Sequence, residues 1–286
     1  YRSDLSDGRV VFAAMGDYGT GGADAQEVAN LIDSFDVDLI ITTGDNSYDG
    51  NDYDFSAGQF YWPYIGNYQG AYDAGSPLNR FFPTLGNHDY AEGGGLPAYE
   101  AFFTLPGDGI PGSGTSGNER YYDFVRGSVH FFAINSCEEE PDGITSTSDQ
   151  ADWLQAQLAA SSAPWKIVFL HHPPYSSGDN HGSTEDLLWP FEDWGATAVI
   201  AGHDHLYERI LRDENGDGVK LPYFIAGTGG RSLYGFGPPL PGSMARYGAN
   251  TVPGNEFGSM IITAGPESII FQFFSVNPAH GAGGLI

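Results

Sequence analysis

The chain has 286 residues, and its 41% hydrophobic and 14% aromatic side chains are typical of a globular protein and exclude a disordered one. The formal charge of −26 gives a surface that repels nucleic acids and anionic membranes, so we expect neither as a partner. Such a surface suits salty or extracellular surroundings, and we expect an extracellular or periplasmic location. No apolar run approaches the roughly 20 residues that span a bilayer. The single Cys137 excludes an internal disulfide, and no feature indicates an oligomeric state.

Apolar runs at six places predict strands that are covered on both faces. The runs are rich in β-branched and aromatic residues and lack the regular alternation of a half-exposed strand. They occupy residues 9–17, 37–45, 81–89, 128–136, 165–172 and 196–205.

A helix is predicted between the first two strands, over residues 23–35. Its apolar side chains share one face, at Ala25, Val28, Ala29, Ile32 and Phe35. Asp24 and Glu27 have the spacing of a capping box. The resulting β-α-β unit is expected to be right-handed.

A second helix is predicted within residues 145–160, where Ala151, Leu154 and Leu158 are in phase behind a Ser/Thr cap. It leads directly into the strand at 165–172. The alternation of helix and strand therefore continues.

The remaining segments indicate insertions, loops and hairpins. Glycine and aromatic residues dominate residues 49–80, which we expect to be an insertion packed near the functional site. Residues 107–117 have the composition of a flexible loop, and two hairpins are predicted after residue 206. The glycine-rich residues 279–286 indicate a tail.

Five segments place chemically active side chains directly after predicted strands. Because the carboxyl ends of strands in an open α/β sheet meet at one crevice, these segments are expected to supply one site. They are Gly16-Asp17-Tyr18-Gly19, Gly44-Asp45-Asn46-Ser47-Tyr48, Gly86-Asn87-His88-Asp89, Val168-Phe169-Leu170-His171 and Gly202-His203-Asp204-His205.

The side chains of these segments are those of a metal site. Carboxylates, imidazoles and an amide oxygen bind borderline or hard cations such as zinc, iron and manganese. Glycines before Asp17, Asp45, Asn87 and His203 are expected to let the backbone turn sharply. His203 and His205 are two residues apart in an extended segment, and a local bend there would let them bind two different ions, but not easily one.

Two cations need a shared ligand, and Asp45 is the natural candidate. A bridging carboxylate between ions roughly 3.5–4 Å apart is the usual device of two-metal hydrolases. Tyr48 lies three residues further on. A buried phenolate is a strong ligand for ferric iron, although Tyr48 taken alone is also explained as a packing aromatic.

The ordered motifs GDYG, GDNSY, GNHD, VFLH and GHDH resemble the metallophosphoesterase (calcineurin-like) superfamily and, within it, the purple acid phosphatases. The motifs span residues 16–205, and the tyrosine after the second aspartate selects the purple subgroup. The resemblance implies an Fe3+ site made by Asp17, Asp45, Tyr48 and His205. It implies a second site for Zn2+, Fe2+ or Mn2+, made by Asp45, Asn87, His171 and His203.

The same resemblance implies a function and a fold. The function is hydrolysis of phosphate monoesters, small phosphorylated substrates, by attack of a metal-bound hydroxide, with His88 and His181 as catalytic histidines that contact the substrate. The fold is an α/β (α+β) four-layer α/β/β/α sandwich of two mixed β-sheets flanked by helices, with the dinuclear site at the strand ends. Residues 1–286 are then a single metallophosphoesterase catalytic domain.

Two other functions remain open. The first is a phosphodiesterase of the same superfamily, and the second is a non-catalytic metal-binding secreted module. The intact ligand set together with His88 argues against the second, because a binding module has no need of a proton donor.

Other candidate ligands have structural explanations. Residues 213–218 match the start of a calcium loop but lack its twelfth-position Glu, so a hairpin turn is the preferred interpretation and Ca2+ the alternative. We expect His130 to be a core residue and His172 to point away from the site that His171 faces, while His280 lies in the tail.

Overall fold

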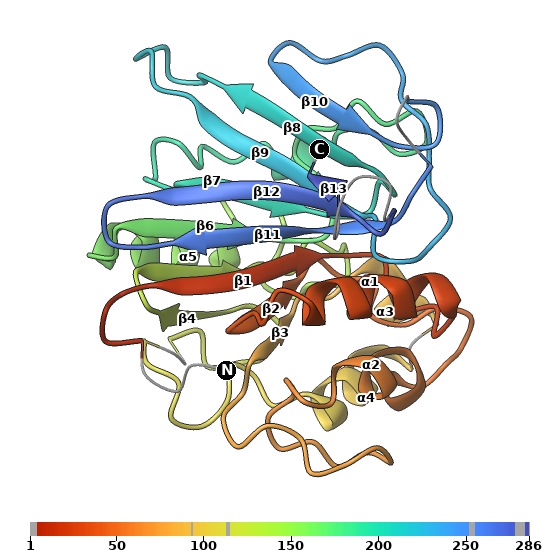
Figure 1. Ribbon diagram of the computed structural model, residues 1–286. Helices are drawn as coiled ribbons and strands as arrows, with labels where there is room; N and C mark the ends of the chain where they lie inside the picture. Colours follow the sequence, from red (N-terminus) through yellow and green to blue (C-terminus); the bar gives the residue numbers. More distant parts are fainter. Residues whose placement is uncertain (1–4, 93, 113–114, 252–254, 278–283, 286) are drawn as a thin grey trace.

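The computed structural model describes residues 5–92, 94–112, 115–251, 255–277 and 284–285. Two mixed β-sheets pack against each other, with α1 beside the first and α5 beside the second (Figure 1). The strand order is β13-β12-β11-β1-β2-β3 in one sheet and β10-β8-β9-β7-β6-β5-β4 in the other. The prediction of two mixed sheets flanked by helices is confirmed.

All six predicted apolar runs contain a strand, whereas β4, β10 and β13 were not predicted. The first sheet comprises β1 Val10–Met15, β2 Leu39–Thr42, β3 Phe81–Pro83, β11 Gly258–Ala264, β12 Ile269–Ser275 and β13 Gly284–Leu285. The second comprises β4 Tyr122–Arg126, β5 Val129–Ala133, β6 Trp165–Phe169, β7 Ala198–Ala201, β8 Tyr207–Arg212, β9 Leu221–Ala226 and β10 Ser243–Tyr247.

Each sheet contains a run of adjacent parallel strands. β1, β2 and β3 are parallel neighbours, as are β5, β6 and β7. Aromatic side chains fill the space between the sheets, where the rings of Phe12 on β1 and Phe131 on β5 meet edge to face at 4.9 Å. Burial on both faces explains why these strands are continuously apolar.

Helix α1 (Ala23–Asp33) buries the predicted face, including Ala25, Val28 and Ile32. The predicted capping box is wrong. Gly22 is the N-cap residue, and no side chain caps the helix. Asp24 lies within the first turn, so it does not occupy the cap position. Its carboxylate there interacts favourably with the helix dipole.

Helix α5 (Asp149–Ala160) begins at the predicted cap, because the Ser148 hydroxyl accepts a hydrogen bond from the Ala151 backbone N–H at 3.2 Å. Leu154 and Leu158 are buried, and they belong to an apolar cluster that includes Val168 of β6. This cluster covers the outer face of the second sheet.

The insertion at 49–80 packs against the main core. It forms a π-helical turn over Asp54–Gly58 and the short helix α2 over Gln59–Tyr61. Its buried aromatic residues join the core of the first sheet. Tyr53 also donates a hydrogen bond to Asp89 at 3.1 Å, which ties the insertion to the third motif.

The two late hairpins are confirmed as β8-β9 and β11-β12, both antiparallel. Further helices are α3 Asn87–Ala91, α4 Gly95–Phe102 and a 3-10 turn at Glu185–Leu187. Residues 279–283 and 286 of the predicted tail, with His280, lie outside the described residues, whereas Gly284 and Leu285 pair with β12. Among the described residues, no helix has the length and apolar character that crossing a membrane requires.

Candidate metal centre

The five motif segments meet where the two sheets present their strand ends. Asp17, Asp45 and Asn87 follow β1, β2 and β3 of the first sheet. His171 follows β6 of the second sheet, and His203 and His205 follow β7. The site is therefore built jointly by both sheets.

The first group of ligand atoms surrounds the Tyr48 hydroxyl, which is buried. It lies 2.8 Å from Asp45 Oδ2, 3.3 Å from Asp17 Oδ1 and 3.4 Å from His205 Nε2. Asp17 Oδ1 and His205 Nε2 are themselves 3.4 Å apart. These four side chains are the set that the sequence assigned to the ferric site.

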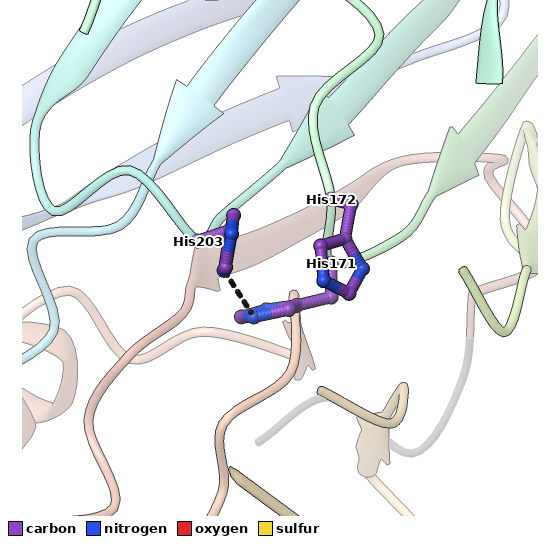
Figure 2. Close-up of side chains that lie close together, drawn as sticks. All are labelled: His171, His172 and His203. Atoms are coloured by element: carbon purple, nitrogen blue, oxygen red, sulfur yellow. Dashed lines mark hydrogen bonds between the residues drawn. The ribbon is translucent and has the colours of Figure 1, made fainter. Parts of the chain in front are cut away.

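The second group of ligand atoms surrounds His171 Nε2. This nitrogen lies 3.0 Å from Asn87 Oδ1, 3.1 Å from His203 Nδ1 and 3.4 Å from Asp45 Oδ1. Figure 2 shows His171 and His203 approaching each other from the loops after β6 and β7. These are the residues that the sequence assigned to the divalent site.

Asp45 belongs to both groups through different oxygens. Oδ2 accepts the hydrogen bond from Tyr48, and Oδ1 faces His171. Oδ1 also accepts a hydrogen bond from the His88 backbone N–H at 3.0 Å. The carboxylate thus has the orientation required of a bridging ligand.

The hydrogen bonds of His171 leave its Nε2 lone pair directed at the site. Burial, with His172 nearby, lowers the pKa of His171 well below its usual value, so the ring is neutral. Its Nδ1 lies 2.7 Å from the Thr43 carbonyl oxygen and therefore carries the hydrogen. Nε2 and Asn87 Oδ1 are then two acceptors at 3.0 Å, an arrangement that a cation between them stabilises.

His205 is oriented in the same way. Its Nδ1 lies 2.8 Å from the Ser232 carbonyl oxygen, and its ring stacks on Tyr234 at 4.1 Å. The other nitrogen, Nε2, points toward Tyr48 and Asp17. A carbonyl partner that fixes the tautomer of an imidazole is typical of metal-binding histidines.

Buried acidic groups give the site its electrostatic character. Burial, and then the charge of Asp17, raises the pKa of Asp45 well above its usual value. Burial, with Asp17 and Asp45, likewise raises the pKa of Tyr48. Bound cations would compensate these charges and reverse both shifts, so the donor set fits two metal ions.

The backbone is strained at three of these residues. Asp17, Asp45 and His203 have φ angles of 59°, 54° and 68°. These angles lie in the left-handed region, which residues other than Gly, Asn and Asp seldom adopt. Such strain persists where the surrounding structure enforces it, commonly at functional sites.

The expected role of the preceding glycines is corrected by these angles. Of Gly16, Gly44, Gly86 and Gly202, only Gly44 has a positive φ. The other three are required by close packing. A Cβ at Gly86 would lie 2.2 Å from Asp45 Oδ1, and one at Gly202 would lie 2.7 Å from Asp17 Oδ2.

His88 and His181 lie at opposite sides of the candidate centre. The His88 ring lies 4.5 Å from the Tyr48 ring, and its Nδ1 is 3.3 Å from Glu92 Oε1. The His181 ring is exposed and stacks on His203 at 3.9 Å. Both predicted catalytic histidines are therefore beside the ligand groups, one at each.

His172 contradicts its prediction. Its ring lies 4.4 Å from the His203 ring, so it lies beside the site instead of pointing away (Figure 2). The segment after β6 is a loop and does not alternate as a strand would, which invalidates the argument from strand alternation. His130, by contrast, is a buried residue of β5 as expected.

Sequence reasoning also missed two carboxylates that position the site. Asp89 accepts hydrogen bonds from the backbone N–H groups of Gly86 and Asn46, which joins the third motif to the second. Asp204 accepts from the Ser176 hydroxyl and from the backbone N–H of His181, which holds the loop that carries His181. Both carboxylates lie within the five motif segments, and this position could have indicated that they support the site.

The predicted turn at 213–218 is the β8-β9 hairpin. Its Asp213 and Asp217 lie near Glu192, a group that can hold a cation. Exposed acidic groups of this kind are common without one. Calcium at this turn stays a prediction.

Known proteins resemble this chain in both sequence and fold. A family model for the calcineurin-like phosphoesterases matches residues 10–207. An uncharacterized protein of Mycobacterium tuberculosis is 30% identical over 50% of this chain, which spans only 30% of that relative. Purple acid phosphatase 7 of Arabidopsis thaliana is 27% identical, with 96% of this chain and 86% of the relative covered.

Two solved structures have the same fold. Purple acid phosphatase PPD1 from yellow lupin seeds has a TM-score of 0.70 at 18% identity, covering 94% of this chain and 52% of its own. GAP50, the anchor in the inner membrane complex of Plasmodium, has a TM-score of 0.67 at 20% identity, covering 94% and 85%. Because the family model matches more than half of this chain, the chain belongs to the calcineurin-like phosphoesterase family.

Proposed function

We propose that this protein is a metal-dependent phosphoric monoester hydrolase of the purple acid phosphatase type. The observation that carries the proposal is Asp45, whose two carboxylate oxygens face two separate groups of ligand atoms. This is the geometry of a carboxylate that bridges two cations in a hydrolase. The relatives named purple acid phosphatases support the same conclusion.

The ligand assignment follows the two groups. Fe3+ would be held by Asp17, Asp45, Tyr48 and His205, and the second ion, Zn2+, Fe2+ or Mn2+, would be held by Asp45, Asn87, His171 and His203. The mixture of phenol and carboxylates in the first group suits a hard trivalent ion. The imidazoles and amide oxygen of the second suit a borderline divalent ion.

The reaction would use both the metals and the surrounding side chains. Two cations held at this site would polarise the phosphoryl oxygens and activate water at acidic pH. His88 lies beside Tyr48 and His181 stacks on His203, where a histidine can hold the phosphate or protonate the departing alcohol oxygen. Glu92, 3.3 Å from His88 Nδ1, would keep that ring oriented.

Two alternatives need tests of their own. A phosphodiesterase of the family would hydrolyse a diester faster than its matching monoester, and comparing the two rates decides this point. A non-catalytic role is raised by GAP50, an anchor with the same fold, because fold alone does not determine function. The presence of His88 and His181 beside the ligand groups favours an enzyme.

The organisation and surroundings of the protein are part of the proposal. The core shared by both sheets supports one catalytic domain. The acidic surface supports an extracellular or periplasmic location and disfavours nucleic acid or membranes as partners.

The first experiment is a visible absorption spectrum of the purified protein, with a metal analysis. We expect a purple or pink band that disappears in Tyr48→Phe and persists in Tyr234→Phe, whose ring stacks on His205. A colourless protein with two divalent ions would remove Tyr48 from the ligand set and favour a diesterase-like member of the family.

A further inference from the structure

A cavity of about 290 Å³ adjoins the second ligand group. Asn87 and His172 line it, and both are partly buried. Asn87 Oδ1 lies 3.0 Å from His171 Nε2, so the cavity opens directly beside the proposed divalent ion. A substrate phosphate at the metals would have its ester oxygen within reach of this space.

His172 is fixed at the wall of the cavity by two contacts with Ser136, which also lines it. Its backbone N–H donates to the Ser136 hydroxyl at 2.9 Å, and its Nδ1 lies 3.0 Å from the same oxygen. Its Nε2 has no hydrogen-bond partner among the side chains and backbone groups that the structure describes. This nitrogen is available to a polar atom of a bound ester.

The outer wall of the cavity is acidic. Glu138, Glu139 and Asp186 line it and are exposed. Among the described residues that line the cavity, none is a lysine or an arginine. A group that leaves the phosphate and extends into the cavity therefore meets negative potential.

We infer that this cavity receives the alcohol portion of the substrate and selects phosphate monoesters whose alcohol carries a positively charged amine. The inference rests on the proposed phosphatase function and names the substrate class for that site. Water supplies the hydroxyl that joins phosphorus, the ester P–O bond breaks, and the amino alcohol leaves with a proton. Monoesters whose alcohol portion carries negative charge, such as sugar bisphosphates, are disfavoured by the same carboxylates.

The expected preference follows from the exposure of these carboxylates. An exposed pair of opposite charges contributes up to about 1 kcal/mol, which corresponds to about a fivefold change. Three carboxylates together give a preference of about tenfold or more for the cationic ester. Added salt reduces this preference, because it screens exposed charges.

The test compares choline phosphate with its uncharged isostere, in which carbon replaces the quaternary nitrogen. The kcat/KM ratio of the two esters is measured for the wild type and for Glu138→Gln, Glu139→Gln and Asp186→Asn, singly and combined. The ratio should fall about twofold to fivefold with each substitution. Glu267→Gln makes the same charge change in the β11-β12 turn, at the opposite end of β1, and should leave the ratio unaltered.

The outcomes separate this inference from the proposed function. Equal kcat/KM for the two esters in the wild type, or a preference that survives the combined substitution, overturns the inference while the phosphatase activity stands. If neither ester is hydrolysed by metal-loaded protein, the proposed function fails and the inference fails with it. Melting temperatures of the variants confirm that each is folded.

Discussion

At the scale of single residues, the site concentrates negative charge where water does not reach. Asp17 and Asp45 are essentially fully buried, and Tyr48 is buried between them. Burying carboxylates without compensating cations is costly. Much of the stability of the metal-loaded protein should therefore come from metal binding.

Asp45→Asn is expected to abolish binding of both metals and activity together, because the amide cannot offer two anionic oxygens. The metal-free variant should melt at or above the temperature of metal-free wild type, since one of two repelling carboxylates is gone. Metal analysis and calorimetry measure both effects. Asp36→Asn is the control, because Asp36 also has a positive φ, of 48°, but is exposed. Full metal content in Asp45→Asn would refute the bridging role.

Two substitutions in the same assay should distinguish the proposed catalytic histidines from the proposed metal ligands. His88→Ala is expected to retain both metals and lose about 10²–10⁴-fold in kcat, the usual contribution of a general acid or base. His181→Ala should lose activity with the metals retained and leave the visible band in place. If His88→Ala purifies without metal, His88 is a ligand and the assignment must change.

At the scale of elements, helix α3 is tied to the loop after β2, and both carry proposed metal ligands. Its first residue is Asn87, and Asp89 accepts the Gly86 backbone N–H at 2.8 Å while also accepting from Asn46. Burial raises the pKa of Asp89 to about 6. The loop after β2 and the start of α3 are thus fixed to each other by one carboxylate.

Gly86→Ala tests this close contact. The φ of Gly86 is −117°, which alanine adopts freely, so any effect comes from the added methyl group 2.2 Å from Asp45 Oδ1. We expect a loss of about 1–3 kcal/mol in the free energy of unfolding, as in other overpacked sites, together with weaker metal binding. Gly237→Ala is the matched control, because its nearest atom is 3.6 Å away. Equal stability and metal content in the two variants would show that the loops can move apart.

At the scale of the whole molecule, the metals would join the two sheets. Asp17, Asp45 and Asn87 follow strands of the first sheet, and His171 and His203 follow strands of the second. A ligand that binds only the folded state at 1,000 times its Kd adds about 4 kcal/mol of stability. Chelation should therefore lower the melting temperature of the wild type and leave that of Asp45→Asn unchanged.

His172 should make the metal-free protein sensitive to acid. Burial lowers the pKa of His172 from 6.5 to about 4. Between pH 6.5 and pH 4, the His172 ring is protonated in the unfolded chain but neutral in the folded one. The stability of the folded state is therefore highest above pH 6.5 and is lost as the pH falls toward 4.

This loss amounts to roughly 3 kcal/mol, from about 1.4 kcal/mol for each pKa unit. His172→Gln, which does not titrate, should flatten the dependence of unfolding free energy on pH across this window. Denaturant titrations of chelated protein at pH 4 and pH 7 measure it. An identical slope in the variant and the wild type would place the acid sensitivity elsewhere.

Much of the fold was predictable from local sequence. The buried strands and the faces of α1 and α5 follow from periodicity that the chain must keep wherever it folds. β4 and β10 were missed because short edge strands carry mixed side chains, and their pairing with β5 and β8 is a long-range property. The capping box at Asp24 failed because its spacing does not fix where a helix begins.

The sequence by itself determined which residues form the candidate centre, because short motifs at strand ends specify both the ligand type and its place on a sheet. The family resemblance also divided them into two groups, whereas only the tertiary structure decided how the side chains are oriented. The packing of two sheets turns the two oxygens of Asp45 to opposite groups, brings His172 beside His203 and opens a cavity with an acidic wall. These features depend on distances between segments far apart in the chain, which no local pattern encodes.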